Sequence, residues 1–433
     1  MEGSCGALVR ILIGCVFIRC CVFHVNGCVE EERRALLDIK LSLDSVGYNS
    51  TALEDWVIGG GDCCNWTGVT CGNSSYQHNI ISISLNYVRE GFISEEWYPN
   101  GSHFGQFTEL DQLDLAFNSI AGWVDPQGFM ILQNLKSLLL ADNHIKRVDP
   151  WISNITSLQA IDLSSNMIEE FPSGFWGMQN LEYLHLGDND IKRVHPSILN
   201  NTSLQLLDLS SNMIKEFPSG FWGMQNLEYL HLGDNDIKRV HPSISNNTSL
   251  QLLDLSSNMI KEFPSGSIPE SFQNLTSLES LDLSFNNLSS EIPPQLAQLN
   301  ALSTFRVAYN NLSGIIPSNR QFSTFNASDF EGNPNLCGLL VGRSCSNGTS
   351  ETHRITDDEV DKQRVIDSPV IYYSFIGASH AIGFWGVIAV IVFKYNWRNN
   401  HHFNMVNVLD SLVSNLAGQY PLCPQVNRGV RPI

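Results

Sequence analysis

The sequence is short of positive charge. Its 433 residues include 25 Lys and Arg against 44 Asp and Glu, which gives a formal net charge of −19 at pH 7. The few basic residues form no block that could contact successive phosphates, and nucleic-acid binding depends on such contacts. We therefore expect no nucleic acid among the partners of this chain.

Motifs that carry enzyme chemistry are also missing from the sequence. It contains no phosphate-binding loop, no nucleophilic serine motif and no protein-kinase signature. No histidine and no second cysteine pair lies at zinc spacing from the adjacent Cys63 and Cys64. These absences predict a protein that is not an enzyme and that uses no cofactor and no metal.

Long apolar runs occur only near the two ends of the chain. In residues 1–27, Arg10 precedes a short apolar run, and small residues follow it. That layout is typical of a secretory signal peptide. A short membrane anchor or a disordered terminus is the alternative.

The second apolar run, residues 370–393, is long enough to cross a bilayer. A helix of this run spans roughly 35 Å at 1.5 Å per residue, and a hydrocarbon core is about 30 Å thick. Acidic residues precede it in 351–369, whereas Lys394 and Arg398 follow it at once. The positive-inside rule then predicts a single transmembrane helix in contact with membrane lipid, an extracellular N-terminus and a cytoplasmic tail, 394–433.

Small residues lie four positions apart on this membrane segment. They are Gly377, Ser379, Ala381 and Gly383. Small side chains let a second helix approach closely within the bilayer. They predict a pairing face for a single-pass partner, and ordinary membrane-helix composition is the alternative.

Cysteines and glycosylation sequons mark the segment between the two apolar runs as extracellular. Even numbers of cysteines near both ends of that segment indicate disulfides. These cysteines are Cys28, Cys63, Cys64, Cys71, Cys337 and Cys345. Asn-x-Ser/Thr sequons all fall on the proposed outside, and the tail contains none. Their asparagines are Asn49, Asn65, Asn73, Asn100, Asn154, Asn200, Asn201, Asn246, Asn247, Asn274, Asn287, Asn311, Asn326 and Asn347.

A leucine-rich frame, L-x-x-L-x-L-x-x-N, recurs nine times between Leu110 and Asn310, after a degenerate first strand at Ile80–Leu85. Its asparagines are 23 to 25 residues apart, except for 28 residues between Asn258 and Asn286. Each frame predicts a short strand of a parallel sheet whose leucines point inward and whose asparagine bonds the backbone of the turn. Because one repeat cannot bury its apolar face alone, about ten repeats must stack between two caps.

The segments between the strands are of two types. One contains Gly-x-Ile-Pro or its remnant, and the other reads EFPSGFWGMQNL. In the second type we expect Phe171, Phe175 and Met178 to fill the core behind the sheet. We expect Trp176 to lie on the convex surface.

Two irregularities interrupt the repeat. Residues 164–209 recur almost unchanged as 210–255, which indicates a tandem duplication of two repeats. Near residues 259–270 one repeat type runs directly into the other, which indicates either an internal deletion or a fused gene model.

The middle outward positions of successive strands alternate between aspartate and histidine. Neighbouring strands lie about 4.8 Å apart, so each histidine is expected between two aspartates on the exposed concave face. The flanking carboxylates should raise the pKa of His185 and His231. This strip is our candidate site for a cationic peptide, and ordinary repeat framework is the alternative; no tetrahedral metal-ligand set is evident. The candidate residues are Asp162, Tyr183, His185, Asp208, Tyr229, His231 and Asp254.

These features resemble the plant leucine-rich-repeat receptor-like proteins. The segment CVEEERRALLDIK…DCCNWTGVTC is similar to the N-terminal cap of that family, and EGNPNLCGLL is similar to its C-terminal cap. The run IGFWGVIAVIVFKYNWR resembles its membrane exit. Members of the family usually carry more repeats and a non-repeat island, and this chain has neither.

The resemblance implies an α/β leucine-rich-repeat solenoid, a horseshoe with a parallel sheet on its concave face. It implies a disulfide cap at 28–75, repeats at 76–315 and a second cap at 316–350. It also implies three disulfides, which join Cys28 to Cys63, Cys64 to Cys71 and Cys337 to Cys345.

The function implied by the resemblance is that of a plasma-membrane receptor in defence or development. Such a receptor binds an extracellular peptide or protein ligand and signals through a leucine-rich-repeat receptor kinase, which serves as adaptor or co-receptor. The alternatives are a decoy or wall-protein-binding module similar to polygalacturonase inhibitors, and a truncated receptor that does not signal.

Overall fold

The computed structural model describes residues 28–44, 51–72, 78–89, 95–261, 263 and 267–345. Contacts divide the chain into residues 1–347 and 348–433, and every described residue belongs to the first unit. Within the described ranges, no helix is long and apolar enough to cross a membrane. The expected signal peptide, acidic segment, membrane helix with its four pairing residues, and cytoplasmic tail lie outside those ranges.

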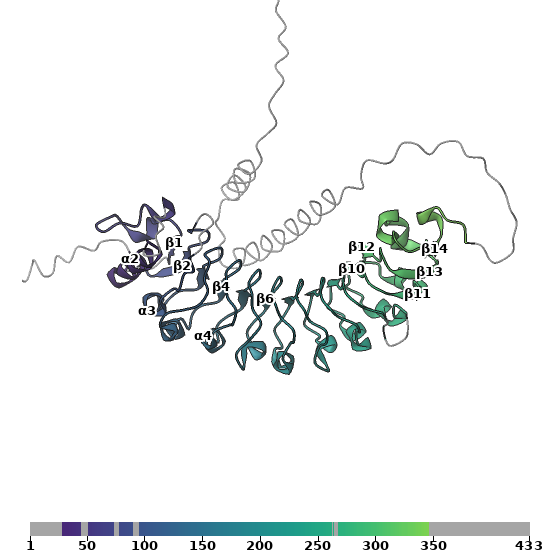
Figure 1. Ribbon diagram of the computed structural model, residues 1–433, viewed down its shortest axis with the longest axis horizontal. Coiled ribbons are helices and arrows are strands. Elements are labelled where there is room, and N and C mark those ends of the chain that lie inside the picture. The colour runs from purple at the N-terminus through teal and green to yellow at the C-terminus, as the bar shows by residue number, and fades with distance from the viewer. Residues whose placement is uncertain are drawn as a thin grey trace, which may run out of the picture. The chain divides into compact units, whose positions relative to one another are not determined.

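A curved eleven-stranded sheet lines the inner side of the first unit (Figure 1). The first two strands pair in antiparallel fashion, and every later strand is parallel to its neighbour. The nine framed strands and the degenerate first strand are therefore confirmed. The strands are β1 Val69–Cys71, β2 Ile80–Ser84, β3 Gln112–Asp114, β4 Ser137–Leu139, β5 Ala160–Asp162, β6 Tyr183–His185, β7 Leu206–Asp208, β8 Tyr229–His231, β9 Leu252–Asp254, β10 Ser280–Asp282 and β12 Thr304–Arg306.

The framing asparagines join one turn of the solenoid to the next. The Nδ2 group of Asn166 donates to the carbonyls of Leu140 and Leu163 at 3.0 and 3.1 Å, and its Oδ1 accepts the amide of Ile145 at 3.0 Å. Because these backbone groups are buried, leaving them unpaired would cost about 1–3 kcal/mol each. The inward asparagine predicted from the sequence is thus confirmed.

A second, three-stranded parallel sheet accompanies the last repeats, and the sequence pattern did not predict it. It consists of β11 (Ser289–Glu291), β13 (Asn311–Ile315) and β14 (Asn335–Cys337). Strands β11 and β13 follow the framing asparagines Asn286 and Asn310 within three residues, and the buried Leu288 and Leu312 anchor the extended backbone there. The last repeats, which contain the Gly-x-Ile-Pro segments, therefore form a second sheet that the FWGM repeats lack.

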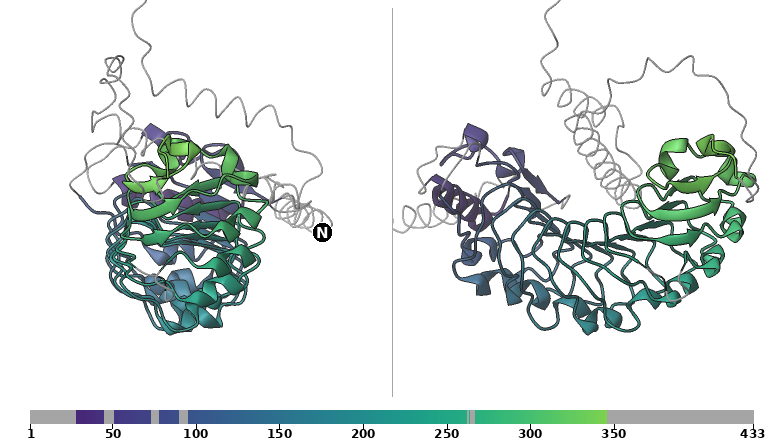
Figure 2. Two further views of the ribbon diagram at one scale, coloured as in Figure 1. Left: turned by 90° about the vertical axis from the view of Figure 1, so that its right-hand side faces the viewer. Right: turned by 45° about the vertical axis from the view of Figure 1, so that its right-hand side comes forward.

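Short helices cover the convex side, and their bulk next to the narrow strands gives the solenoid its curvature (Figure 2). Several begin with a proline, whose fixed φ suits the first helical position. The α-helices are α2 Glu30–Asp44, α3 Gly101–Phe104 and α4 Pro150–Asn154. The 3-10 helices are η1 Thr51–Leu53, η2 Cys63–Asn65, η3 Pro126–Ile131, η4 Phe175–Gly177, η5 Pro196–Asn200, η6 Phe221–Gly223, η7 Pro242–Asn246, η8 Glu270–Asn274, η9 Pro294–Gln298, η10 Arg320–Thr324, η11 Ala327–Phe330 and η12 Leu339–Val341.

The FWGM segments bury more than we expected. Phe175 and Met178 are buried as predicted, and Phe171 is half-buried. The prediction that Trp176 lies on the convex surface is wrong, because its side chain is only 4% exposed. Its ring centroid lies 4.7 Å from that of Phe171 and 5.8 Å from that of Phe175. The 3-10 turn folds the indole back onto these rings, which removes its large apolar area from water.

Both ends of the solenoid are closed by caps. The three disulfides that the resemblance implied are present, two in the N-terminal cap and one in the C-terminal cap. In the N-terminal cap, α2 turns Leu36, Ile39 and Leu43 toward the first turn of the solenoid. These contacts and crosslinks cover the apolar edges that the terminal repeats would otherwise expose.

The unusual 28-residue spacing does not disturb the sheet. Strand β10 pairs with β9 in the same parallel register as the other neighbours, with Asp282 opposite Asp254. Ile268 and Phe263 are buried, and the ring of Phe263 lies 5.3 Å from that of Phe272 in η8. Residues 262 and 264–266 lie outside the described ranges.

Candidate functional site

Strand pairing places the candidate concave residues in one row. Asp162 lies opposite His185, which lies opposite Asp208; His231 and Asp254 continue the row on the next two strands. We call these five residues the Asp/His strip. The five side chains line up because the parallel sheet keeps a constant register from strand to strand. Asp and His alternate along this line because they alternate in the sequence.

Each aspartate of the strip is held by its own turn. One carboxylate oxygen, Oδ1, accepts the backbone amide two residues later at 2.9 Å in all three cases, from Ser164, Ser210 and Ser256. The hydroxyls of Ser164 and Ser210 donate to the same oxygen at 2.6 and 2.7 Å. The second oxygen of each carboxylate takes no part in this turn. The aspartates therefore serve the framework. The expectation of an exposed strip is wrong for Asp162, which is only 4% exposed, whereas Asp208 and Asp254 are half-buried.

His185 and Asp208 form an ion pair, with Nδ1 of the histidine 3.9 Å from Oδ2 of the aspartate. The expectation that this histidine is exposed is wrong, because only 11% of its side chain reaches solvent. Burial disfavours its charged form, but hydrogen bonding to Asp208 and the charges of Asp162 and Asp208 outweigh that effect and raise its pKa. Burial alone would raise the pKa of Asp208, but the hydrogen bond from His185 and the charges of His231 and His185 hold it well below its usual range.

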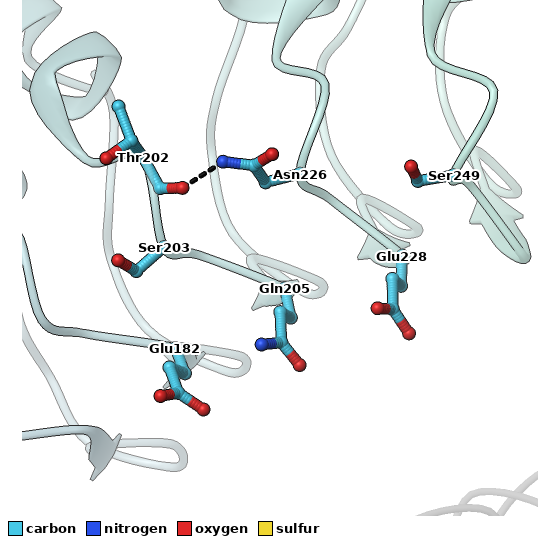
Figure 3. A pocket seen from close by; sticks show the side chains of 7 residues that line it. All are labelled: Glu182, Thr202, Ser203, Gln205, Asn226, Glu228 and Ser249. Atoms are coloured by element: carbon cyan, nitrogen blue, oxygen red, sulfur yellow. Dashed lines mark hydrogen bonds between the residues drawn. The ribbon is translucent and has the colours of Figure 1, made fainter.

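A second group of polar side chains borders the strip, and the sequence analysis did not single it out. We call this open pocket the acidic groove (Figure 3). Its two carboxylates, Glu182 and Glu228, come from the residue before every second strand. The first variable position of the frame alternates between Glu and Gln, and this alternation is the sequence signal for the acidic groove. It is lined by Glu182, Thr202, Ser203, Gln205, Asn226, Glu228 and Ser249.

The two tyrosines of the candidate site connect the strands of the strip to the glutamines that precede the next strands. The hydroxyl of Tyr183 donates to Oε1 of Gln205 at 3.3 Å, and the hydroxyl of Tyr229 donates to Oε1 of Gln251 at 2.7 Å. The amide of Gln251 donates in turn to Oε2 of Glu228 at 3.0 Å. Each tyrosine therefore presents its ring to the concave side while its hydroxyl is fixed, so that little side-chain freedom remains to be lost on binding.

The predicted modification sites separate clearly from this face. None of the described sequon asparagines lies on a strand of the eleven-stranded sheet. Asn49, Asn73 and Asn347 lie outside the described ranges. Among the described residues, one group has metal-ligand distances, but two of its three members, Cys28 and Cys63, form a disulfide.

Family comparison matches the cap and the repeats. The leucine rich repeat N-terminal domain matches residues 29–72, and leucine rich repeat models match 133–191, 179–237, 249–275 and 277–299. With the curved parallel sheet and the inward asparagines, these matches define a leucine-rich-repeat protein with an N-terminal repeat cap.

Within this class, the chain is similar to plant receptor-like proteins. It is 41% identical over 151 residues to Receptor-like protein 45 of Arabidopsis thaliana. That match covers 33% of this chain and 16% of the relative, so the chain spans a small part of the relative's length.

Two solved plant structures share the fold. One is the ectodomain of the receptor kinase GASSHO1/SCHENGEN3 from Arabidopsis thaliana in complex with CASPARIAN STRIP INTEGRITY FACTOR 2, with 29% identity and a TM-score of 0.51 over 57% of this chain and 30% of that one. The other is a plant ice-binding protein, with 26% identity and a TM-score of 0.58 over 74% of this chain and 99% of that one.

Proposed function

We propose that this chain is a receptor-like protein of the cell surface that binds an extracellular peptide or protein ligand on its concave face. The observation that carries the proposal is the row of carboxylates formed by the Asp/His strip and the acidic groove. Carboxylates that recur in register on every second strand attract basic side chains and steer a cationic partner to the surface. The similarity to an ectodomain that was solved with its factor supports the same use of the fold.

The spacing of the strip aspartates suggests the spacing of the basic residues in such a ligand. The strip aspartates stand on every second strand, so they are about 10 Å apart along the sheet. In a peptide with the polyproline II conformation, which has three residues per turn, residues three positions apart lie on the same face about 9 Å apart. We therefore propose a peptide that crosses the strands with Lys or Arg at every third position. Because each aspartate is already fixed by its turn, binding costs little loss of rotamer freedom on the receptor side.

Synthetic peptides provide a direct test with the purified full chain. We would measure fluorescence anisotropy with a nine-residue peptide that carries lysines at positions 1, 4 and 7, and with a peptide of equal charge whose lysines are adjacent. The variant Asp162→Asn with Asp254→Asn retains the Oδ1 acceptors but removes two charges. The matched control, Glu30→Gln with Glu31→Gln, removes two exposed charges on the N-terminal cap.

We expect the peptide with spaced lysines to bind more tightly than the peptide with adjacent lysines. The strip variant should weaken that binding about tenfold, which corresponds to about 1.4 kcal/mol, and the cap variant should change it little. Equal affinity for both peptides, or equal weakening by both variants, would show that net charge alone attracts the probe and that the strip is not a site.

We also propose that the chain lies in the plasma membrane with its repeats on the extracellular side. Residues 370–393 would form the single membrane helix, and a leucine-rich-repeat receptor kinase would pair with it as adaptor or co-receptor. Its support is the sequence pattern of apolar, small and flanking charged residues. The chain itself would contribute no enzyme activity.

A second candidate, from another class, is a binding module or decoy that acts without a signalling partner. Its support is that the described solenoid is capped at both ends and aligns with 99% of a solved plant protein of this fold. Fractionation of cells that express the full chain separates the two proposals. Recovery with integral membrane proteins after an alkaline wash favours the receptor, and recovery in the soluble fraction favours the module.

A further inference from the structure

Two short runs of the sequence contain overlapping glycosylation sequons. Residues 200–203 and 246–249 both read Asn-Asn-Thr-Ser, so each run offers two adjacent acceptor asparagines. The structure puts the two members of each pair in opposite environments. Asn200 and Asn246 are exposed at the ends of η5 and η7, whereas the asparagine that follows each one is buried.

Asn201 is a structural link between two turns of the solenoid. Its Nδ2 donates to the carbonyls of Met178 and Leu181 at 2.7 and 3.0 Å, and its Oδ1 accepts the amides of Ser203 and Leu204, both at 2.8 Å. The side chain is only 6% exposed. Both amide hydrogens and the carbonyl oxygen are therefore in use inside the protein.

Asn247 repeats this arrangement one duplicated unit later. Its Nδ2 donates to the carbonyls of Met224 and Leu227 at 2.8 and 2.9 Å, and it is 2% exposed. Its Oδ1 accepts the amides of Ser249 and Leu250 at 2.9 and 3.1 Å. Two independent copies of the same sequence thus give the same burial and the same four bonds.

Neighbouring repeats show what this position does in the fold. Where Asn201 stands, the other sequon-bearing turns have Ile155 and Leu275, and both are fully buried. The position is therefore a core position of the outer turn. An asparagine is acceptable there because it bonds the carbonyls of the preceding turn, whose burial would otherwise be costly.

A sugar on such a core asparagine is incompatible with the fold. N-glycosylation joins Nδ2 to the anomeric carbon of a sugar from a lipid-linked oligosaccharide diphosphate. The bond from that carbon to the diphosphate oxygen breaks, and Nδ2 loses one proton. Asn201 would lose one of its two donated bonds, and the sugar would have to enter the space between two packed turns.

We infer that Asn200 and Asn246 carry the glycans of the two runs and that Asn201 and Asn247 remain unmodified in the folded chain. Asn154 and Asn274 are likewise exposed last residues of convex helices, α4 and η8. The four positions make one row of glycans on the convex edge. The row leaves the Asp/His strip uncovered. This inference rests on the extracellular location proposed above.

Single-residue changes separate the overlapping sequons without touching either asparagine. Ser203→Ala removes only the sequon of Asn201, and Thr202→Ala removes only that of Asn200. Backbone bonds at both positions are retained. Ser249→Ala and Thr248→Ala make the same separation in the second run.

The full chain would be expressed in plant cells, and glycans would be released enzymatically in H₂¹⁸O, which labels each formerly glycosylated asparagine for peptide mass spectrometry. We expect the label on Asn200 and Asn246, no loss of glycan in the two Ser→Ala variants, and loss of one glycan in each Thr→Ala variant.

Label on Asn201 or Asn247 in the folded wild-type chain would overturn the inference, as would a glycan lost from a Ser→Ala variant. Label on Asn65 with none on Asn200 and Asn246 would also overturn it while leaving the extracellular location intact. A chain without any glycan would reject both the inference and that location.

Discussion

Replacing Glu32 by Gln should remove much of the pH dependence of stability between about pH 4.5 and 7. Glu32 lies in the first turn of α2 and is only 3% exposed. Its two carboxylate oxygens share the backbone amide of Ile80, at 3.2 and 3.1 Å, and so connect the cap helix to strand β2. Burial raises the pKa of this carboxyl from 4.5 to about 7, in spite of that hydrogen bond.

The raised pKa fixes the sign of the effect. Between pH 4.5 and 7 the folded state keeps a proton that the unfolded state releases, so stability is fully present below pH 4.5 and is lost as pH rises through about 7. At 1.36 kcal/mol per unit, the loss amounts to about 3 kcal/mol. A glutamine is neutral at every pH, and its carbonyl oxygen can still accept the amide of Ile80.

Thermal unfolding followed by circular dichroism at pH 5 and pH 8 measures the effect. We expect the wild type to lose roughly 5 °C more than the Glu32→Gln variant over this range. Glu31→Gln is the matched control, because Glu31 is its exposed neighbour on the same helix. Other titrating groups act equally in all three proteins and cancel in the comparison. If Glu32→Gln keeps the pH dependence of the wild type, burial of this carboxyl does not control the stability of the cap.

Three further changes test the N-terminal cap, the Asp/His strip and the membrane segment. Cys71→Ser breaks a cap disulfide, a loss of about 2–4 kcal/mol, and should block secretion; normal secretion of the folded variant would contradict the need for a closed cap. His185, whose pKa is raised, stabilises the fold below about pH 6.5 and loses this contribution as pH rises. His185→Gln should therefore flatten the fall in melting temperature above that pH, and a slope equal to that of the control His144→Gln would disprove it. Gly377→Leu with Gly383→Leu should reach the membrane but no longer co-purify a receptor kinase; retention of the kinase would exclude this helix face as the contact.

The sheet could be predicted from the sequence because its period is rigid. Once the leucines of each frame point inward, the positions between them must face the concave side, and a constant register then sets Asp162 beside His185 and Asp208 beside His231. No structural knowledge beyond strand geometry was needed for that part of the candidate site.

The outer turns carry no such period, and predictions there were less successful. The burial of Trp176 depends on space left between two adjacent turns, which neither turn reveals alone. The acidic groove was missed because its side chains come from residues that precede the strands. Glu32 was within reach of sequence reasoning, since it lies four residues before Leu36 on the apolar face of its helix, but a carboxyl is not normally counted among core residues.

The concave aspartates show that the framework and ligand interpretations need not compete. A side chain that bonds only its own turn through Oδ1 gives the fold what it needs and leaves Oδ2 of Asp208 to hold His185. The same bond sets the direction of the second oxygen in each repeat that carries an aspartate at this position, so the charged row is a consequence of how these turns are built. A ligand that matches the repeat distance would meet acceptors that are already oriented. Tandem duplication of such a unit lengthens the fold and the charged row together, which allows a solenoid to acquire a longer binding surface without new side-chain arrangements.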